Sequence, residues 1–335
     1  MKIRNLFLFI PFLFCHQVAC AQYRVSKPID TLAHKKFISL VNFNKDQSYL
    51  TLGNGIGNQI PIIFEAQLSP SYFVSSSHKK WAVMINPQVQ IRMLDQYSVP
   101  IQVPSYHLYL TYYRYLDSWR NTFLSRILYS DAIWFASVVH HSNGQSGKFY
   151  TNDTTKAIDL TGGSFAVNYI QLGISSFTLN TTGSKYFSLR EIKVHTELYP
   201  SSWCDPHLNG IYGFTRLFAT LDVGGPRHQE KKDWVNRLIQ NSSIEVKSGW
   251  IFGALRGFSL LDVSKRLIVD LNYKYYPPWL DEIAFFVRFY SGQDYYNIYF
   301  EKQLTTLTVG ITSSTIKLAN NFRFIDVKKK KQGNY

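Results

Sequence analysis

Apolar and polar residues alternate along several segments of this chain, which is the pattern of β-strands with one apolar face. Three such segments lie at about residues 266–275, 282–290 and 306–312. In each, every second residue is apolar, and the residues between are mostly charged or polar. Strands with an apolar outer face and a polar inner face are typical of a transmembrane barrel. A soluble β-sandwich has the same alternation with its faces inverted, so the period alone does not separate the two.

Strand-like segments recur from about residue 61, with no internal repeat and no second domain. They predict an all-β fold, a transmembrane antiparallel β-barrel over residues 61–324, and about twelve strands fit that length. Residues 22–60 are polar and irregular, so we expect an N-terminal periplasmic arm before the barrel. Residues 226–243 are expected to form a loop with one short helix. Residues 325–335 form a basic C-terminal tail.

The first residues have the features of a secretory signal peptide, which we assign to residues 1–21. Lys2 and Arg4 precede an apolar run from Leu6 to Cys15, and residues 19–21, Ala-Cys-Ala, form a small-residue cleavage pattern. The apolar run is too short for a helical membrane anchor. The pattern therefore predicts an exported protein.

Composition favours a membrane barrel over a soluble secreted β-protein. Beyond the signal, Cys204 is the one cysteine, so the mature chain forms no internal disulfide. No later stretch of about 18 apolar residues predicts a spanning helix. Aromatic residues make up 16% of the chain, with 23 Tyr and 24 Phe. An exported, aromatic-rich chain that has neither an internal disulfide nor a predicted spanning helix fits a closed barrel.

The formal net charge of +14 indicates an acidic partner. An exported chain with a lipid-facing pattern argues against nucleic acid and favours anionic lipid or lipopolysaccharide. The lysine run at residues 328–331 is interpreted as a solvated tail, with attraction to a membrane surface as the alternative.

A His-x-Ser pair lies at the end of the predicted strand that runs to residue 142. His140 and Ser142 share one face, because side chains two apart in a strand point the same way. Val138 and Trp134 lie on the same face. A potential base and nucleophile would thus lie at the end of an apolar strand face. This position favours lipid as the substrate class.

The next predicted strand, at about residues 164–178, supplies a third group. Its apolar face begins with Ser164 and Asn168, and an antiparallel hairpin would bring this start beside His140 and Ser142. A Ser-His pair needs a third group that holds the imidazole tautomer and orientation. Asn168 could do this without bringing a charge into hydrocarbon.

Residues 140–145, His-His-Ser-Asn-Gly-Gln, together with Ser164 and Asn168, resemble the outer-membrane phospholipase A family. That family has a His-x-Ser-Asn-Gly motif and a downstream Ser-x-x-x-Asn. Residues 290–297, Tyr-Ser-Gly-Gln-Asp-Tyr-Tyr-Asn, are similar to its Tyr-Ser-Gly segment. The likeness covers roughly residues 80–315 and is specific in these blocks.

The resemblance implies a twelve-stranded barrel in the bacterial outer membrane that hydrolyses phospholipid acyl esters. Ser142 would be the nucleophile and His140 its base. Asn168 would orient the imidazole, and the backbone N–H of Gly144 would donate to the oxyanion.

The resemblance also implies dependence on Ca²⁺ and an active homodimer. It places calcium near the Gln145 carbonyl and the Ser164 hydroxyl. Both are hard oxygen ligands of the kind that calcium prefers. Because both are neutral, water or the second subunit would have to supply more ligands.

Two other functions remain open at this point. A lipid A deacylase is another barrel esterase with a His-x-Ser-Asn motif, but its third member is typically acidic and its barrel is smaller. Asn168 and the length of the chain favour the phospholipase. The other alternative is a channel or structural barrel that carries the motif without catalysis.

Overall fold

The computed structural model describes residues 31–313, except for 57–60, 77–79, 98–99, 124, 126–129, 153, 179–187, 226–232 and 281. The predicted signal peptide and basic tail lie outside the described residues. Among those that are described, no helix is both long and apolar enough to cross a membrane.

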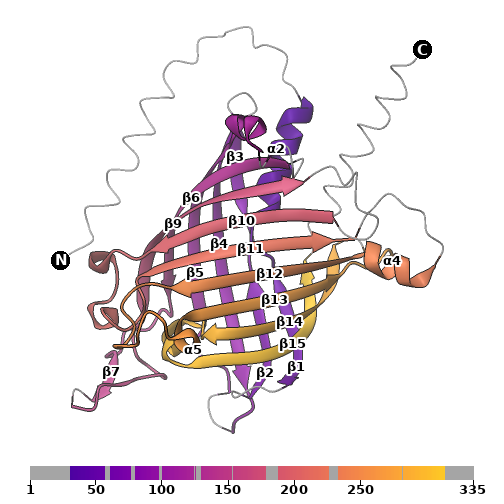
Figure 1. The fold of residues 1–335 in the computed structure, drawn as a ribbon. Coiled ribbons are helices and arrows are strands. Elements are labelled where there is room, and N and C mark those ends of the chain that lie inside the picture. The colour runs from indigo at the N-terminus through magenta and orange to yellow at the C-terminus, as the bar shows by residue number, and fades with distance from the viewer. Residues whose placement is uncertain are drawn as a thin grey trace, which may run out of the picture.

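Thirteen strands form one antiparallel sheet that curves round and closes (Figure 1). β2 pairs with the second half of β4 and β3 with the first half, so these two share one strand position and the barrel has twelve. The strands are β1 (Tyr49–Ile56), β2 (Ile62–Leu68), β3 (Tyr72–Ser76), β4 (Trp81–Leu94), β5 (Ser105–Tyr115), β6 (Ser130–Ser142), β9 (Ala166–Thr178), β10 (Ser188–Leu198), β11 (Thr215–Gly224), β12 (Ser242–Ile251), β13 (Leu267–Tyr275), β14 (Ile283–Gln293) and β15 (Gln303–Ser313).

Short elements lie before and between the barrel strands. In the loop after β6, β7 (Tyr150–Asn152) pairs with β8 (Ala157–Ile158). The helices are α2 (Thr31–Phe43), α4 (Trp234–Gln240) and α5 (Val263–Arg266), with 3₁₀ turns η2 (Asp117–Asn121), η3 (Ser201–Trp203), η4 (Pro206–Leu208) and η5 (Asn297–Glu301). The short helix expected within residues 226–243 is α4.

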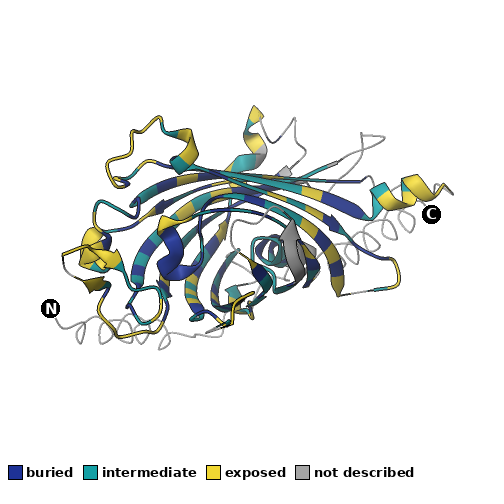
Figure 2. Cartoon of the chain, turned by 90° about the horizontal axis from the view of Figure 1, so that it is seen from below, coloured by how far each residue is buried: buried dark blue, intermediate teal, exposed yellow. Residues whose placement is uncertain are grey.

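Most of the long barrel strands alternate in burial along their length, as Figure 2 shows, with apolar side chains facing outward and polar side chains facing inward. Val138, Leu172 and Val309 point outward and are 43–51% exposed. Ser137 and His195 point inward and are 2–3% exposed. The lumen keeps a cavity of about 340 Å³ lined by charged side chains. The predicted twelve-stranded antiparallel barrel with its apolar face outward is confirmed.

The barrel begins earlier in the chain than predicted. Residues 49–56, assigned to the irregular arm of residues 22–60, form β1, which pairs with β15 and β2 and completes the ring. The sequence of β1, Tyr-Leu-Thr-Leu-Gly-Asn-Gly-Ile, has a weak strand propensity because Gly and Asn interrupt its alternation. Pairing with two neighbouring strands overrides that local preference.

The expected arm also contains a helix. Phe37, Leu40 and Val41 of α2 are 0–1% exposed and pack in one cluster with inward-facing Tyr113 and Phe135. α2 therefore lies against the inner wall of the barrel, at the end where β6 begins. The predicted irregular arm did not include this helix, because polar residues flank its short apolar stretch on both sides.

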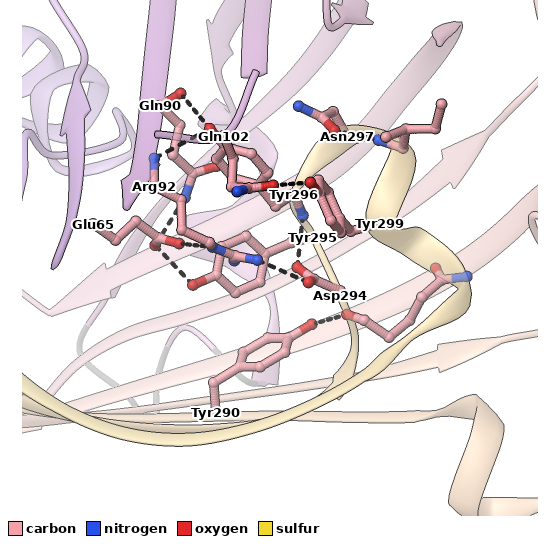
Figure 3. Close-up of polar contacts among 12 residues, drawn as sticks. Glu65, Gln90, Arg92, Gln102, Tyr290, Asp294, Tyr295, Tyr296, Asn297 and Tyr299 are labelled. Atoms are coloured by element: carbon pink, nitrogen blue, oxygen red, sulfur yellow. Dashed lines mark hydrogen bonds and ion pairs between the residues drawn. The ribbon is translucent and has the colours of Figure 1, made fainter. Parts of the chain in front are cut away.

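A buried ion-pair network crosses the lumen near the other end (Figure 3). The Arg92 guanidinium donates from Nε to Glu65 Oε2 and from Nη1 to Asp294 Oδ2, each at 2.8 Å. Tyr49 and Tyr295 donate hydroxyl protons to Glu65 Oε1 at 2.6 and 2.8 Å. The network joins β1, β2 and β4 to the loop that follows β14.

The Arg92 network predicts a large effect on stability. Arg92→Met leaves the Glu65 and Asp294 carboxylates buried without their cation, so it should lower the free energy of unfolding by about 3–5 kcal/mol. Lys80→Met is the control, because its ion pair with Asp117 is solvent-exposed and should contribute about 1 kcal/mol or less. Urea unfolding of both variants in lipid vesicles measures the difference. Equal midpoints for the two variants would contradict a stabilising role for the buried network.

Candidate active site

The candidate catalytic side chains lie where β6 ends and β9 begins. The two strands pair so that His140 lies opposite Asn168 and Ser142 opposite Ala166. His140 Nε2 is 3.1 Å from Ser142 Oγ, and His140 Nδ1 is 2.8 Å from Asn168 Oδ1. His140 is exposed, whereas Ser142 and Asn168 are half-buried. All three side chains are on the outward, apolar side of the wall.

The orientation of the Asn168 amide sets the tautomer of His140. Asn168 Nδ2 donates to the backbone carbonyl of Trp203, so its Oδ1 faces the imidazole. An amide oxygen only accepts, and therefore His140 Nδ1 carries the proton. The Nε2 lone pair is then free to accept the Ser142 hydroxyl proton. This is the tautomer in which the imidazole can act as a base toward Ser142.

Trp203 belongs to η3 in the loop between β10 and β11, which packs on the start of β9. Cys204 Sγ donates to the carbonyl of Asn168 at 3.4 Å, and Asp205 N donates to the carbonyl of Ala166 at 3.0 Å. Burial raises the pKa of the Cys204 thiol, which keeps it protonated and able to donate. The sequence carried no signal for the Trp203 contact, because it comes from a backbone carbonyl of a separate loop.

The turn after Ser142 is held by the buried side chain of Asn143. Its Nδ2 donates to the carbonyl of Gly163 at 2.8 Å, and its Oδ1 accepts from Phe165 N at 3.0 Å and from Gln145 N at 3.2 Å. Gly144 follows with φ +68°, in the left-handed region that glycine adopts without strain. A Cβ at this position would lie 3.3 Å from the Tyr106 ring.

The two expected calcium ligands lie on two segments that run side by side. Ser164 N donates to the carbonyl of Gly147 at 3.1 Å, and Gly147 N donates to the carbonyl of Gly162 at 3.1 Å. Ser164 is half-buried and precedes β9, whereas the predicted strand included it; Gln145 is exposed. Within the described part of the chain, no group of three or more His, Cys, Asp or Glu residues could hold a metal ion. Gln145 and Ser164 therefore offer neutral oxygens only.

The segment from residue 294 to residue 302, part of which is drawn in Figure 3, packs against the loop between β6 and β9. Asn297 Nδ2 donates to the carbonyl of Val103 at 2.9 Å. Tyr299 OH donates to the carbonyl of Leu160 at 3.4 Å, and the Phe300 ring packs 5.9 Å from that of Phe165. The Tyr299 and Phe300 contacts tie the loop between β6 and β9 to this segment, and the Arg92–Asp294 and Asn297–Val103 contacts tie the segment to the barrel.

His141 points into the lumen, because neighbouring residues of a strand lie on opposite faces. It is 4% exposed, its Nε2 lies 2.8 Å from Ser105 Oγ, and its ring stacks on that of His107 with centroids 3.7 Å apart. It therefore packs behind the candidate site, on the opposite face of the strand from His140.

No protein-family model and no curated protein sequence matches this chain. Among solved structures it is similar to outer membrane phospholipase A from Escherichia coli, at 12% identity and a TM-score of 0.50, over 80% of this chain and 96% of that one. An active-site mutant of that protein is 12% identical, with a TM-score of 0.52, over 84% of this chain and 98% of that one. The calcium-bound dimer of the Salmonella typhi outer membrane phospholipase is 13% identical, with a TM-score of 0.51, over 86% of this chain and 99% of that one. The predicted resemblance is thus confirmed in three dimensions, and this chain has the closed twelve-stranded barrel fold of outer membrane phospholipase A.

Proposed function

We propose that this protein is a phospholipase of the bacterial outer membrane that hydrolyses the sn-1 or sn-2 acyl ester bonds of phospholipids. The observation that carries the proposal is the contact chain from Asn168 through His140 to Ser142, in the tautomer that makes His140 a base. It lies on the lipid-facing side of a barrel with the phospholipase fold. A neutral third member suits that position, because a carboxylate there would have to be desolvated by lipid.

In the first step, Ser142 Oγ attacks the ester carbonyl while His140 Nε2 takes the hydroxyl proton. Asn168 holds the imidazolium that results through its bond to Nδ1. The backbone N–H of Gly144 donates to the oxyanion, and one such donor is worth about 3 kcal/mol of barrier.

His140 then returns the proton to the leaving lysophospholipid oxygen, which leaves the acyl group on Ser142. A water molecule gives up a proton to His140 as it attacks the acyl ester. The fatty acid departs, and Ser142 regains its proton.

The outward face beside His140 suits an acyl chain. Leu108 on β5 and Val138 on β6 flank the site and are 46% and 51% exposed. In the membrane this stripe contacts hydrocarbon, so a phospholipid beside the barrel could present its ester bond to Ser142 without leaving the bilayer.

Calcium and a second copy of the chain complete the proposal. The Gln145 carbonyl and the Ser164 hydroxyl fit calcium as hard oxygen donors, and calcium requires six to eight ligands in all, so water and the partner would supply the rest. When bound, calcium would supply positive charge close to the developing oxyanion. The similarity to a calcium-bound dimer of the same fold supports this arrangement.

Substitutions of Ser142, His140 and Asn168 test the mechanism. Ser142→Ala and His140→Ala should each lower kcat by about 10⁴-fold or more, and the double variant should lose little more, because the two residues act as a unit. Asn168→Ala should cost less, since Asn168 orients the base without reacting. The assay is fatty acid release from phospholipid in mixed micelles with calcium, repeated with lipid A as substrate.

Ser146→Ala is the matched control, since this exposed serine lies four residues from Ser142 and has no role in the proposed mechanism. Full activity in Ser142→Ala would refute the mechanism. Hydrolysis of lipid A in preference to phospholipid would favour the deacylase alternative, and no ester hydrolysis by the folded wild type would favour the channel.

The backbone at Gly144 provides a second test. Gly144→Ala forces a Cβ into the left-handed region beside Tyr106, and shifting the oxyanion donor should lower kcat by about 10²-fold. Gly210→Ala is the control, because Gly210 has φ +77° but no neighbour within 4 Å of a Cβ. Steady-state kinetics of the two variants should differ in kcat; the proposed role of Gly144 fails if both retain wild-type turnover.

Removing the Ser164 hydroxyl tests the calcium site. Calcium and dimerisation should strengthen each other by the same factor, as thermodynamic linkage requires. Ser164→Ala should therefore shift the calcium dependence of both activity and dimer crosslinking to higher calcium. Calcium titrations of both properties measure the shift. Full hydrolysis by a monomer in dilute detergent with a chelator would exclude this regulation and leave the Ser142–His140 chemistry intact.

A further inference from the structure

We propose that α4 is a membrane-surface anchor, whose apolar side enters the phospholipid layer around the barrel at the rim opposite the candidate site. α4 joins the end of β11 to the start of β12 and projects from the barrel wall (Figure 1). Ser142 ends β6 at the other rim. Anchoring and hydrolysis would therefore occur at opposite ends of the strands.

The helix presents an unpartnered apolar side. Trp234, Val235 and Leu238 are 73%, 40% and 40% exposed. At 3.6 residues per turn, these three positions fall within about 100° of the helix circumference. We call them the apolar arc. Asn236 and Arg237 lie on the other side, so the helix is amphipathic although it has only seven residues.

The apolar arc is continuous with the lipid-facing wall. Ser242 Oγ donates to the carbonyl of Leu238 at 2.7 Å and contacts Tyr273 OH at 2.8 Å. Tyr273 and its cross-strand neighbour Ile244 point outward and are 36% and 46% exposed. The end of α4 is thus tied to an outward-facing aromatic residue of the barrel wall, which favours lipid as the occupant over a separate protein.

Residue types and charge agree with a lipid headgroup region. Trp is enriched at membrane–water interfaces, where one edge of the ring is apolar and the N–H stays hydrated. Arg237 lies on the polar side of α4, and Lys231 and Lys232 precede the helix in the sequence. Cations beside an interfacial helix attract anionic phospholipid headgroups.

Such an anchor would fix the depth of the barrel in the bilayer. Because β-strands are stiff, the height of one rim determines the height of the other. Anchoring α4 in one leaflet would hold the opposite rim, with His140 and Ser142, level with the ester bonds of the other leaflet.

Lipid-depth quenching of Trp234 tests the proposal. The full chain is placed in phosphatidylcholine–phosphatidylglycerol vesicles whose acyl chains carry bromine near the headgroup or near the chain end. The Trp234 emission is obtained as wild type minus Trp234→Phe. We expect shallow bromine to quench it about twofold more than deep bromine, since an interfacial helix lies at the headgroup boundary.

Two neighbouring substitutions separate the two sides of the helix. Val235→Glu places a charge on the apolar arc and should abolish the shallow quenching of Trp234. Asn236→Glu adds the same side chain on the polar side and should leave the quenching unchanged.

Two outcomes would overturn the anchor. Emission quenched by aqueous acrylamide but by neither brominated lipid would show that the helix stays in water, and emission protected from all three quenchers would show that protein covers it. Fatty acid release is measured in parallel. Trp234→Phe should leave it unchanged, so failure of the anchor is distinguishable from failure of the proposed phospholipase.

Discussion

The rest of this structure depends on one constraint, which is that a backbone in hydrocarbon must satisfy all of its own hydrogen bonds. An open sheet would leave two unpaired edges in lipid. Here β1 joins β15 and β2, and β2 joins β4, so the sheet closes into a ring. In a closed barrel, alternate side chains of each strand face outward or inward. This alternation places His140, Ser142 and Asn168 together on the outer face.

The polar lumen stabilises the rim on which the candidate site lies. An inward-facing arginine must be paired, because its charge is removed from water. Arg92 is paired with Glu65 from a neighbouring strand and with Asp294 from the loop after β14. That loop in turn contacts Leu160 and Phe165 next to the candidate site. The inner polar network and the outer site are therefore mechanically connected through one segment of backbone.

The candidate site combines exposure on the outer face of the barrel with a fixed geometry. His140 is exposed on the outer face, yet both of its ring nitrogens have partners from β6 and β9. The orientation of the third group comes from the Trp203 carbonyl and not from a charge. An arrangement of neutral groups avoids the cost of burying an ion in hydrocarbon while keeping the imidazole in one tautomer.

The sequence by itself determined the barrel and the pairing of His140 with Ser142, because a period of two residues sets the face of every side chain in a strand. It also indicated Asn168, since a hairpin brings together the end of one strand and the start of the next. Only the tertiary structure decided the role of residues 31–56, whose local pattern is weak and whose partners are distant in the chain. It alone decided the orientation of Asn168 and the pairing of Arg92, because their partners Trp203 and Asp294 lie on loops that no local period connects to β9 or β4.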